Sequence, residues 1–267
     1  MPTNFQNYTR MPIRITNQSK ENPKKNWNDW YDITISALNL QRDPQNPDVI
    51  LLNAYNSSIV ENHILSNQSY NAEFYKKIYE YYFHYKKCPL TGSAAKDAIL
   101  DIIRMIDLEN STNVWRYVEN RIYIIRMVDY IVDPSTNFWN DLKNCDQNLV
   151  AKLLNFANGN KGDDEGPKSL ASKVCRYLSE LEYKNKDSYY INDSVVRHVL
   201  PYYLSFFVIK LKSCHKTKQD FDNLTYDDVA YYLDQIKSKL KSQHSIYLTK
   251  TELDHIMWYC YRNGNII

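Results

Sequence analysis

Hydrophobic positions recur along most of the chain at steps of three and four residues, which is the spacing of an amphipathic helix. Trp27, Tyr31, Ile35 and Leu38 follow this spacing and share one predicted stripe. Similar patterns predict helices over residues 71–87, 94–108, 112–132, 135–144, 147–158, 169–182, 193–211, 225–241 and 249–262. Only residues 189–191 have the pattern of an extended stretch. We therefore expect an all-α fold, a bundle of helices.

Breaks in the periodicity divide the predicted helices into two subdomains. Residues 1–26 mix Asn, Gln, Thr, Lys and Pro without a period, and we expect an extended arm there. The helical pattern stops at Asp133-Pro134, because the residue before a proline disfavours the helical conformation. We therefore expect an N-terminal helical subdomain over 27–134 and a second helical subdomain over 135–267.

The residue composition fits helices better than sheets. The chain of 267 residues contains five glycines, and three of them fall in the polar segment 158–167, which predicts a sharp turn there. The 24 tyrosines can bury their rings while their hydroxyls find polar partners, so a Tyr-rich core is workable. Near the C-terminus, Thr249 and Glu252 have the spacing of a helix capping box.

The charge and the cysteine content say more about the cellular location of the protein than about its activity. A net charge of +2 is too small to attract nucleic acid, so DNA binding needs a local basic face. The five cysteines are scattered without a Cys-x-x-Cys pair, which favours reduced thiols in the cytoplasm. No apolar run is long enough to span a membrane, and the polar start lacks a signal-peptide core. We expect a cytoplasmic protein without a membrane partner, and the oligomeric state stays open.

The most informative pattern joins a lysine near one helix start to an aspartate at another. Gly166-Pro167 predicts a bend that leads into a helix bearing Lys173, and Asp193 follows twenty residues later. Asp193 is expected at the N-cap of its helix, where backbone N–H groups and the helix dipole keep the carboxylate ionised. Two neighbouring helices can therefore bring an ammonium and a carboxylate together.

This arrangement resembles the helix-hairpin-helix DNA glycosylase superfamily, most closely its 8-oxoguanine glycosylase branch. The segment 171–175, Ala-Ser-Lys-Val-Cys, falls on the end of the family hairpin, and Ile191-Asn192-Asp193 falls on its aspartate segment. One extra residue separates the two motifs here, and the resemblance covers residues 135–200. Ser169 and Ala171 replace the two hairpin glycines, and Val195 replaces the histidine that follows the family aspartate. These departures indicate a reshaped hairpin.

The resemblance implies a DNA glycosylase, with double-stranded DNA carrying a flipped, damaged or modified base as its partner. Lys173 is then the amine that attacks C1′ of the sugar and forms a Schiff base, which allows strand cleavage. Asp193 stabilises the positive charge that develops on the sugar. The resemblance implies neither a metal nor another cofactor. Removal of modified bases from phage DNA is one biological setting for such an activity.

The same resemblance suggests residues that contact the DNA. Tyr177 comes one turn after Lys173 and is a candidate to stack on the flipped base, with Trp258 as a candidate for the opposite wall. Lys168, Ser169 and Ser172 are candidates to contact phosphate at the helix start.

A second interpretation requires no catalysis. Lys173 can be a solvated helix residue and Asp193 an ordinary N-cap, with Tyr177 and Trp258 in the core. The chain is then a non-catalytic helical module that binds DNA or another protein. Cys214-His215 and the pair His255 and Cys260 lack the spacing of a zinc site, and no phosphate-binding loop or dinucleotide motif occurs.

Overall fold

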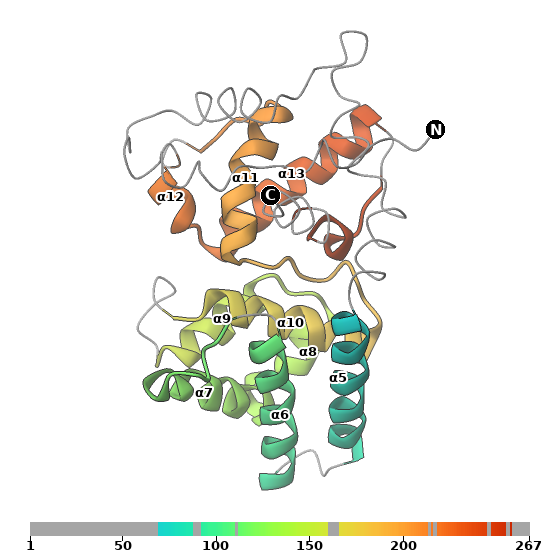
Figure 1. The fold of residues 1–267 in the computed structure, drawn as a ribbon, viewed down its shortest axis with the longest axis vertical. Helices are drawn as coiled ribbons and strands as arrows, with labels where there is room; N and C mark the ends of the chain where they lie inside the picture. The colour runs from blue at the N-terminus through green and yellow to red at the C-terminus, as the bar shows by residue number, and fades with distance from the viewer. Residues whose placement is uncertain are drawn as a thin grey trace. The chain divides into compact units, whose positions relative to one another are not determined.

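The computed structural model describes residues 69–87, 92–109, 112–159, 166–212, 215, 218–244, 247–254 and 257. Over these residues all regular structure is helical and no strand is present, which confirms the all-α prediction (Figure 1). No described helix has both the length and the apolar composition needed to cross a bilayer. The predicted arm over 1–26, the stripe from Trp27 to Leu38 and Trp258 all lie outside the described residues.

The chain divides into two compact units. The first contains Gln68–Asp193 together with Thr225–Asp227, and the second includes Ser194–Leu224 and the described residues from Asp228 onward. The first unit runs through the expected boundary at residue 134, because the helix that ends at Val132 packs against helices that follow it. The division therefore falls about sixty residues later than the sequence pattern suggests, at Asp193 rather than Pro134.

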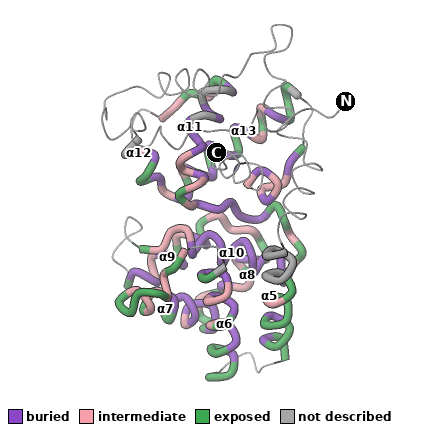
Figure 2. The backbone as a smooth tube through the Cα atoms, viewed as in Figure 1, coloured by how far each residue is buried: buried purple, intermediate pink, exposed green. Residues whose placement is uncertain are grey.

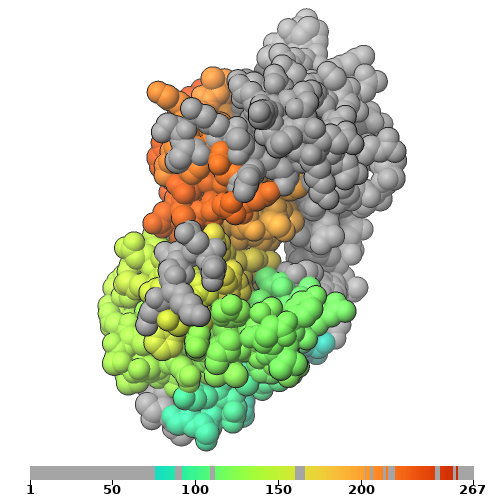
Figure 3. Space-filling view, turned by 90° about the vertical axis from the view of Figure 1, so that its left-hand side faces the viewer, coloured from blue at the N-terminus to red at the C-terminus, as the bar shows by residue number. Residues whose placement is uncertain are grey.

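The first unit is built from six α-helices and two short 3₁₀ turns among the described residues. In chain order these are α5 (Ser69–Lys87), α6 (Ser93–Glu109), η2 (Val118–Asn120), α7 (Arg121–Val132), η3 (Pro134–Thr136), α8 (Phe138–Lys143), α9 (Asn148–Ala157) and α10 (Lys168–Tyr183). Helix α5 packs on α6, α6 on α7, and α7 on α9, while α10 contacts α6, α8 and α9. Figure 3 shows the outer face that α6 to α9 present.

The described part of the second unit contains α11 (Ser194–Phe206), α12 (Lys218–Asp222) and most of α13 (Tyr226–His244). Helix α11 packs against α12. Residues 250–254 are helical as well, and the predicted capping box precedes them: Thr249 N donates to Glu252 Oε2 at 2.7 Å, and Glu252 N donates to Thr249 Oγ1 at 3.2 Å. The sequence prediction of this cap is confirmed.

One predicted helix begins later than its pattern suggests. The prediction over 112–132 is wrong before Arg121, where α7 begins. Asp107 is fully buried, and its carboxylate accepts hydrogen bonds from the backbone N–H groups of Val114 and Trp115, each at 2.8 Å, and from the Thr112 hydroxyl. These bonds hold residues 112–115 in a turn, because a buried carboxylate competes successfully for the amides that a helix needs.

Two other predicted helices are shorter than expected because of left-handed backbone conformations. The prediction over 193–211 is wrong after Phe206, where α11 ends, and Val208 takes a left-handed backbone with φ of 52°. The prediction over 135–144 is interrupted at Asn137, which has φ of 59° and separates η3 from α8. Left-handed residues end a helix whatever the hydrophobic pattern around them.

Helix α10 is the most deeply buried element of the first unit. Every residue from Leu170 to Leu181 is buried, although the run contains Lys173, Arg176 and Glu180 (Figure 2). Burying charged and polar groups costs free energy unless each finds a partner. The partners of these groups therefore decide how α10 sits among its neighbours.

Ion pairs of Lys152 on α9 with Asp141 on α8 and with Asp146 should make the stability of the fold depend on pH. Lys152 Nζ lies 2.8 Å from both Asp141 Oδ2 and Asp146 Oδ2, and its hydrogen bond is the main reason that the pKa of Asp146 is lowered. Because the folded-state pKa is depressed, this link stabilises the fold above the ordinary carboxyl pKa and is lost as the pH falls through the lowered value.

We predict that Lys152→Met lowers the free energy of unfolding by about 1 kcal/mol or less at pH 6, since the lysine is partly exposed. The difference from the wild type should shrink below about pH 4. Urea unfolding at a series of pH values measures it. A difference that stays constant down to pH 2 contradicts the assignment.

Candidate functional site

Lys173 and Asp193 form an ion pair inside the first unit. Lys173 Nζ lies 3.2 Å from Asp193 Oδ2, and the two side chains are 7% and 15% exposed. Lys173 is on the second turn of α10, and Asp193 is the residue just before α11. The two groups that the sequence pattern singles out are therefore direct neighbours, although twenty residues separate them in the chain.

Helix α10 is preceded by a turn whose backbone conformation requires a glycine. Gly166 has φ of 104°, and a Cβ built on it would lie 1.9 Å from Asn158 Oδ1. Pro167 follows in a non-helical conformation, and α10 begins at Lys168. The bend expected at Gly166-Pro167 is present, while residues 160–165 lie outside the described residues.

The segment from Ser188 to Asn192 brings Asp193 to Lys173. All five residues of the segment are buried, and none is in a helix or a strand. The stretch over 189–191 that the pattern marks as extended therefore has no sheet partner. Buried backbone N–H and C=O groups still require hydrogen bonds, so side chains must supply them.

Three side chains from separate helical regions supply those hydrogen bonds. Asn192 N donates to Ser172 Oγ on α10 at 3.0 Å, and Tyr190 N donates to Tyr226 Oη on α13 at 3.2 Å. Gln147, just before α9, donates to the carbonyl of Ser188 at 3.0 Å. Tyr226 Oη in turn donates to Gln147 Oε1 at 3.3 Å, so two of the three side chains support each other.

The sequence pattern missed the structural role of these three side chains. Gln147 and Tyr226 lie far from the Lys–Asp motif in the chain, and no local signal connects them to it. Ser172 and Asn192 do carry a signal, because they precede Lys173 and Asp193 directly and so repeat the twenty-residue spacing. A register that pairs the charged residues also pairs these two neighbours.

Ser172 does not have the exposed hydroxyl expected of a phosphate contact. Its residue exposure is 0%, and its hydroxyl donates to the carbonyl of Ser169 at 3.0 Å while accepting from Asn192 N. A phosphate could therefore reach this hydroxyl only if both hydrogen bonds were broken. Ser169 and Lys168 are half-buried in the first turn of α10, and Lys168 lines a small cavity with α9 residues and Thr225, Tyr226 and Asp227.

Tyr177 lies one turn after Lys173, as expected, but its ring is buried and partly covered. The guanidinium of Arg176 lies 4.5 Å from the Tyr177 ring centroid, and an Arg176 nitrogen lies 3.8 Å from Glu180 Oε2. Cys175, on the same helix, is a free thiol whose pKa is raised by complete burial, which makes it a poor nucleophile. Stacking of a base on Tyr177 therefore requires that Arg176 move.

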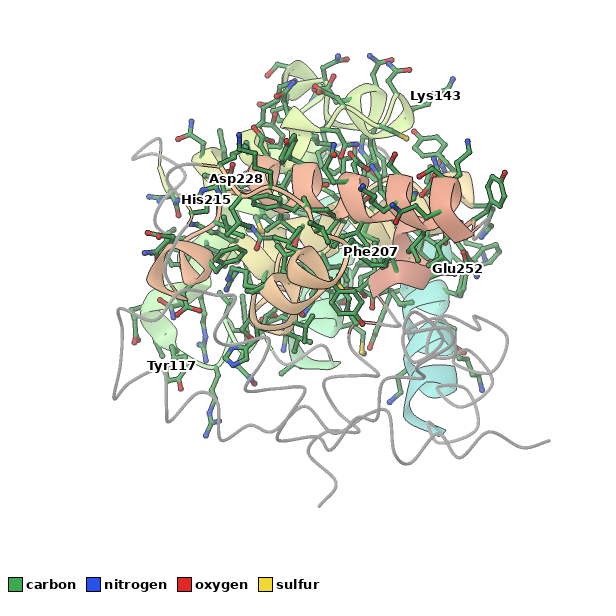
Figure 4. All side chains as sticks on the ribbon, turned by 90° about the horizontal axis from the view of Figure 1, so that it is seen from above. Tyr117, Lys143, Phe207, His215, Asp228 and Glu252 are labelled. Atoms are coloured by element: carbon green, nitrogen blue, oxygen red, sulfur yellow. The ribbon has the colours of Figure 1, made fainter. Side chains whose placement is uncertain are left out.

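A separate polar cluster occupies the second unit. His215 Nδ1 lies 2.8 Å from Tyr232 Oη, and His215 Nε2 lies 3.6 Å from Asp228 Oδ2 (Figure 4). Lys212 Nζ contacts Asp228 Oδ1 at 2.5 Å, and Lys212 N donates to Tyr232 Oη. Within the described residues no three His, Cys, Asp or Glu side chains gather as metal ligands. This cluster connects the 212–215 segment to α13.

Comparisons with protein-family models, with curated proteins and with solved structures find no match to this chain.

We predict that Tyr226→Phe lowers the free energy of unfolding by about 1 to 3 kcal/mol, because it leaves the buried Tyr190 N–H without its acceptor. Chemical denaturation measures the loss. Tyr231→Phe, at a half-exposed position on the same helix, is the matched control and should change stability little. Equal effects of the two substitutions would contradict the proposed support of residues 188–192.

Proposed function

We propose that the chain is a DNA glycosylase that uses Lys173 and Asp193. The observation that carries the proposal is the 3.2 Å separation of the Lys173 ammonium and the Asp193 carboxylate. The motif resemblance requires these two groups to share one sugar-sized site, and they come from separate elements to do so. The bend at Gly166, which leads into the lysine helix, adds support.

The proposed chemistry begins from the ion pair. Lys173 transfers a proton to Asp193 and becomes a neutral amine. The amine nitrogen bonds to C1′ while the bond from C1′ to the base breaks, and that electron pair leaves with the base, which takes up the proton that Asp193 received. The regenerated Asp193 carboxylate stabilises the positive charge on the sugar. The ring oxygen then takes a proton from the lysine nitrogen while the bond from C1′ to that oxygen breaks, and the nitrogen lone pair forms the C=N bond of a Schiff base between Lys173 and C1′.

The proposed substrate is duplex DNA with a damaged or modified base. The glycosidic bond cannot be reached inside the stack, so the nucleotide must leave the helix before Lys173 can approach it. Lys168, half-buried in the first turn of α10, is the proposed phosphate contact. A cytoplasmic enzyme that acts on the modified bases of phage DNA fits this substrate class.

We predict that borohydride traps a covalent complex between the protein and a duplex oligonucleotide that contains one abasic site. This probe tests the lysine without requiring knowledge of the base, because the abasic aldehyde condenses directly with an amine. Lys173→Arg should abolish trapping while keeping the ion pair, since a guanidinium stays charged and forms no Schiff base. Gel electrophoresis under denaturing conditions measures the adduct.

Lys86→Ala is the matched control for this experiment, because Lys86 is an exposed lysine whose amine pairs with Glu182 at 3.0 Å. It should leave trapping unchanged. Base release from oligonucleotides with single damaged bases and from phage-modified DNA, followed by mass spectrometry, then identifies the base. Release that survives both Lys173→Ala and Asp193→Asn rules the assignment out.

The depth of the pair favours a second candidate function. Lys173 is 7% exposed, and the guanidinium of Arg176 lies over the Tyr177 ring. In this alternative the ion pair has a structural role alone, which is to join α10 to the 188–193 segment. The chain is then a non-catalytic helical module that binds DNA or a protein partner. If the partner is DNA, this alternative predicts binding that weakens with salt, and in either case it predicts no base release. Lys173→Arg should then bind the partner as well as the wild type does.

A further inference from the structure

The ion pair has a neutral counterpart one residue upstream on each element. Asn192 N donates to Ser172 Oγ at 3.0 Å, and the next residues along, Asp193 and Lys173, approach to 3.2 Å. The two contacts join the same two segments side by side. The hydrogen bond therefore sets where the Asp193 backbone lies relative to α10.

The geometry of Ser172 leaves its hydroxyl no freedom. Its proton is used in a bond to the carbonyl of Ser169 in its own helix, at 3.0 Å, so an oxygen lone pair must face Asn192 N. Ser172 and Asn192 are 0% and 1% exposed, which keeps water from replacing either partner. The other supports of this segment, Gln147 and Tyr226, act at Ser188 and Tyr190, farther from the acid along the chain.

We propose that Ser172 is a positioning residue for the Lys173–Asp193 pair. It acts through Asn192: the hydroxyl holds the backbone N–H that precedes the acid, and the acid is thereby held against the ammonium. Its effect on turnover rests on the proposed glycosylase function. Its effect on the geometry of the pair does not, so the two can be tested apart.

The test compares Ser172→Ala with Ser179→Ala. Ser179 lies on the same helix, is also 0% exposed, and its hydroxyl oxygen has no hydrogen-bond partner among the described residues. The two substitutions thus remove the same atom from the same environment, and only one removes a bond to the 188–193 segment. Both proteins are purified as full chains.

The first measurement is the rate at which acetic anhydride acylates Lys173 in a short pulse, read by peptide mass spectrometry. We expect Ser172→Ala to raise this rate several-fold, because an amine no longer held against Asp193 in a buried site becomes more accessible to the reagent. Ser179→Ala should match the wild type. An unchanged rate in Ser172→Ala overturns the proposal, whether or not the protein has enzymatic activity.

The second measurement is the single-turnover rate of borohydride trapping on the abasic duplex. We expect Ser172→Ala to lower the rate at saturating DNA by about 10- to 100-fold, as misplacement of a reacting group does, while the DNA concentration for half-saturation stays the same. If wild-type protein traps nothing, the proposed function fails, and the acylation result still decides the role of Ser172.

A control variant must show that a general loss of stability does not by itself raise the acylation rate of Lys173. Val150→Ala, at a buried α9 position, serves as a stability control: its acylation is measured at the temperature where the fraction of unfolded protein equals that of Ser172→Ala. Equal acylation of Lys173 in both variants shows a merely structural role and overturns the proposal. If Ser172→Ala does not fold, amide exchange decides: a protected Asn192 N–H in the wild type supports the bond, and rapid exchange contradicts it.

Discussion

The site depends on one constraint, the need to satisfy the backbone of a buried segment that has no regular structure. Residues 188–192 are buried without helical or sheet hydrogen bonds, so their polar groups depend on side chains. Ser172, Gln147 and Tyr226 meet that need at alternate residues of the segment. Because these side chains come from α10, from the residue just before α9 and from residues 225–227, the segment links these parts of the first unit to one another.

Because α10 is buried, loss of either partner of the ion pair would cost much more free energy than at an exposed site. A charge withdrawn from water is costly unless a partner of opposite charge compensates, and removal of one partner leaves the other uncompensated. Lys173 has Asp193 as such a partner, and Arg176 has Glu180 nearby together with the face of Tyr177. A lysine held in this way is a specific link between two segments. The same geometry underlies both candidate functions.

Local sequence signals predicted some helices closely and failed where backbone conformation or a side-chain hydrogen bond ended the helix. The expected helices over 147–158 and 169–182 match α9 and α10 to within one residue at each end. The expected start at Thr112 failed, because the buried carboxylate of Asp107 takes the amides of Val114 and Trp115. Hydrophobic periodicity reports which face of a segment is buried. It does not report a carboxylate that arrives from the preceding helix.

The sequence by itself determined the helical class and the bend at Gly166, because these follow from periodicity and backbone freedom. It also singled out Lys173 and Asp193 as candidates to lie together, but their contact is a result of the tertiary structure. Only the tertiary structure decided that Ser172 faces inward, that Tyr177 lies under Arg176, and that the first unit continues to Asp193. Burial and hydrogen-bond partners are set by elements remote in the chain. A hydroxyl or an aromatic ring has the same local pattern whether it meets solvent, a ligand or another helix.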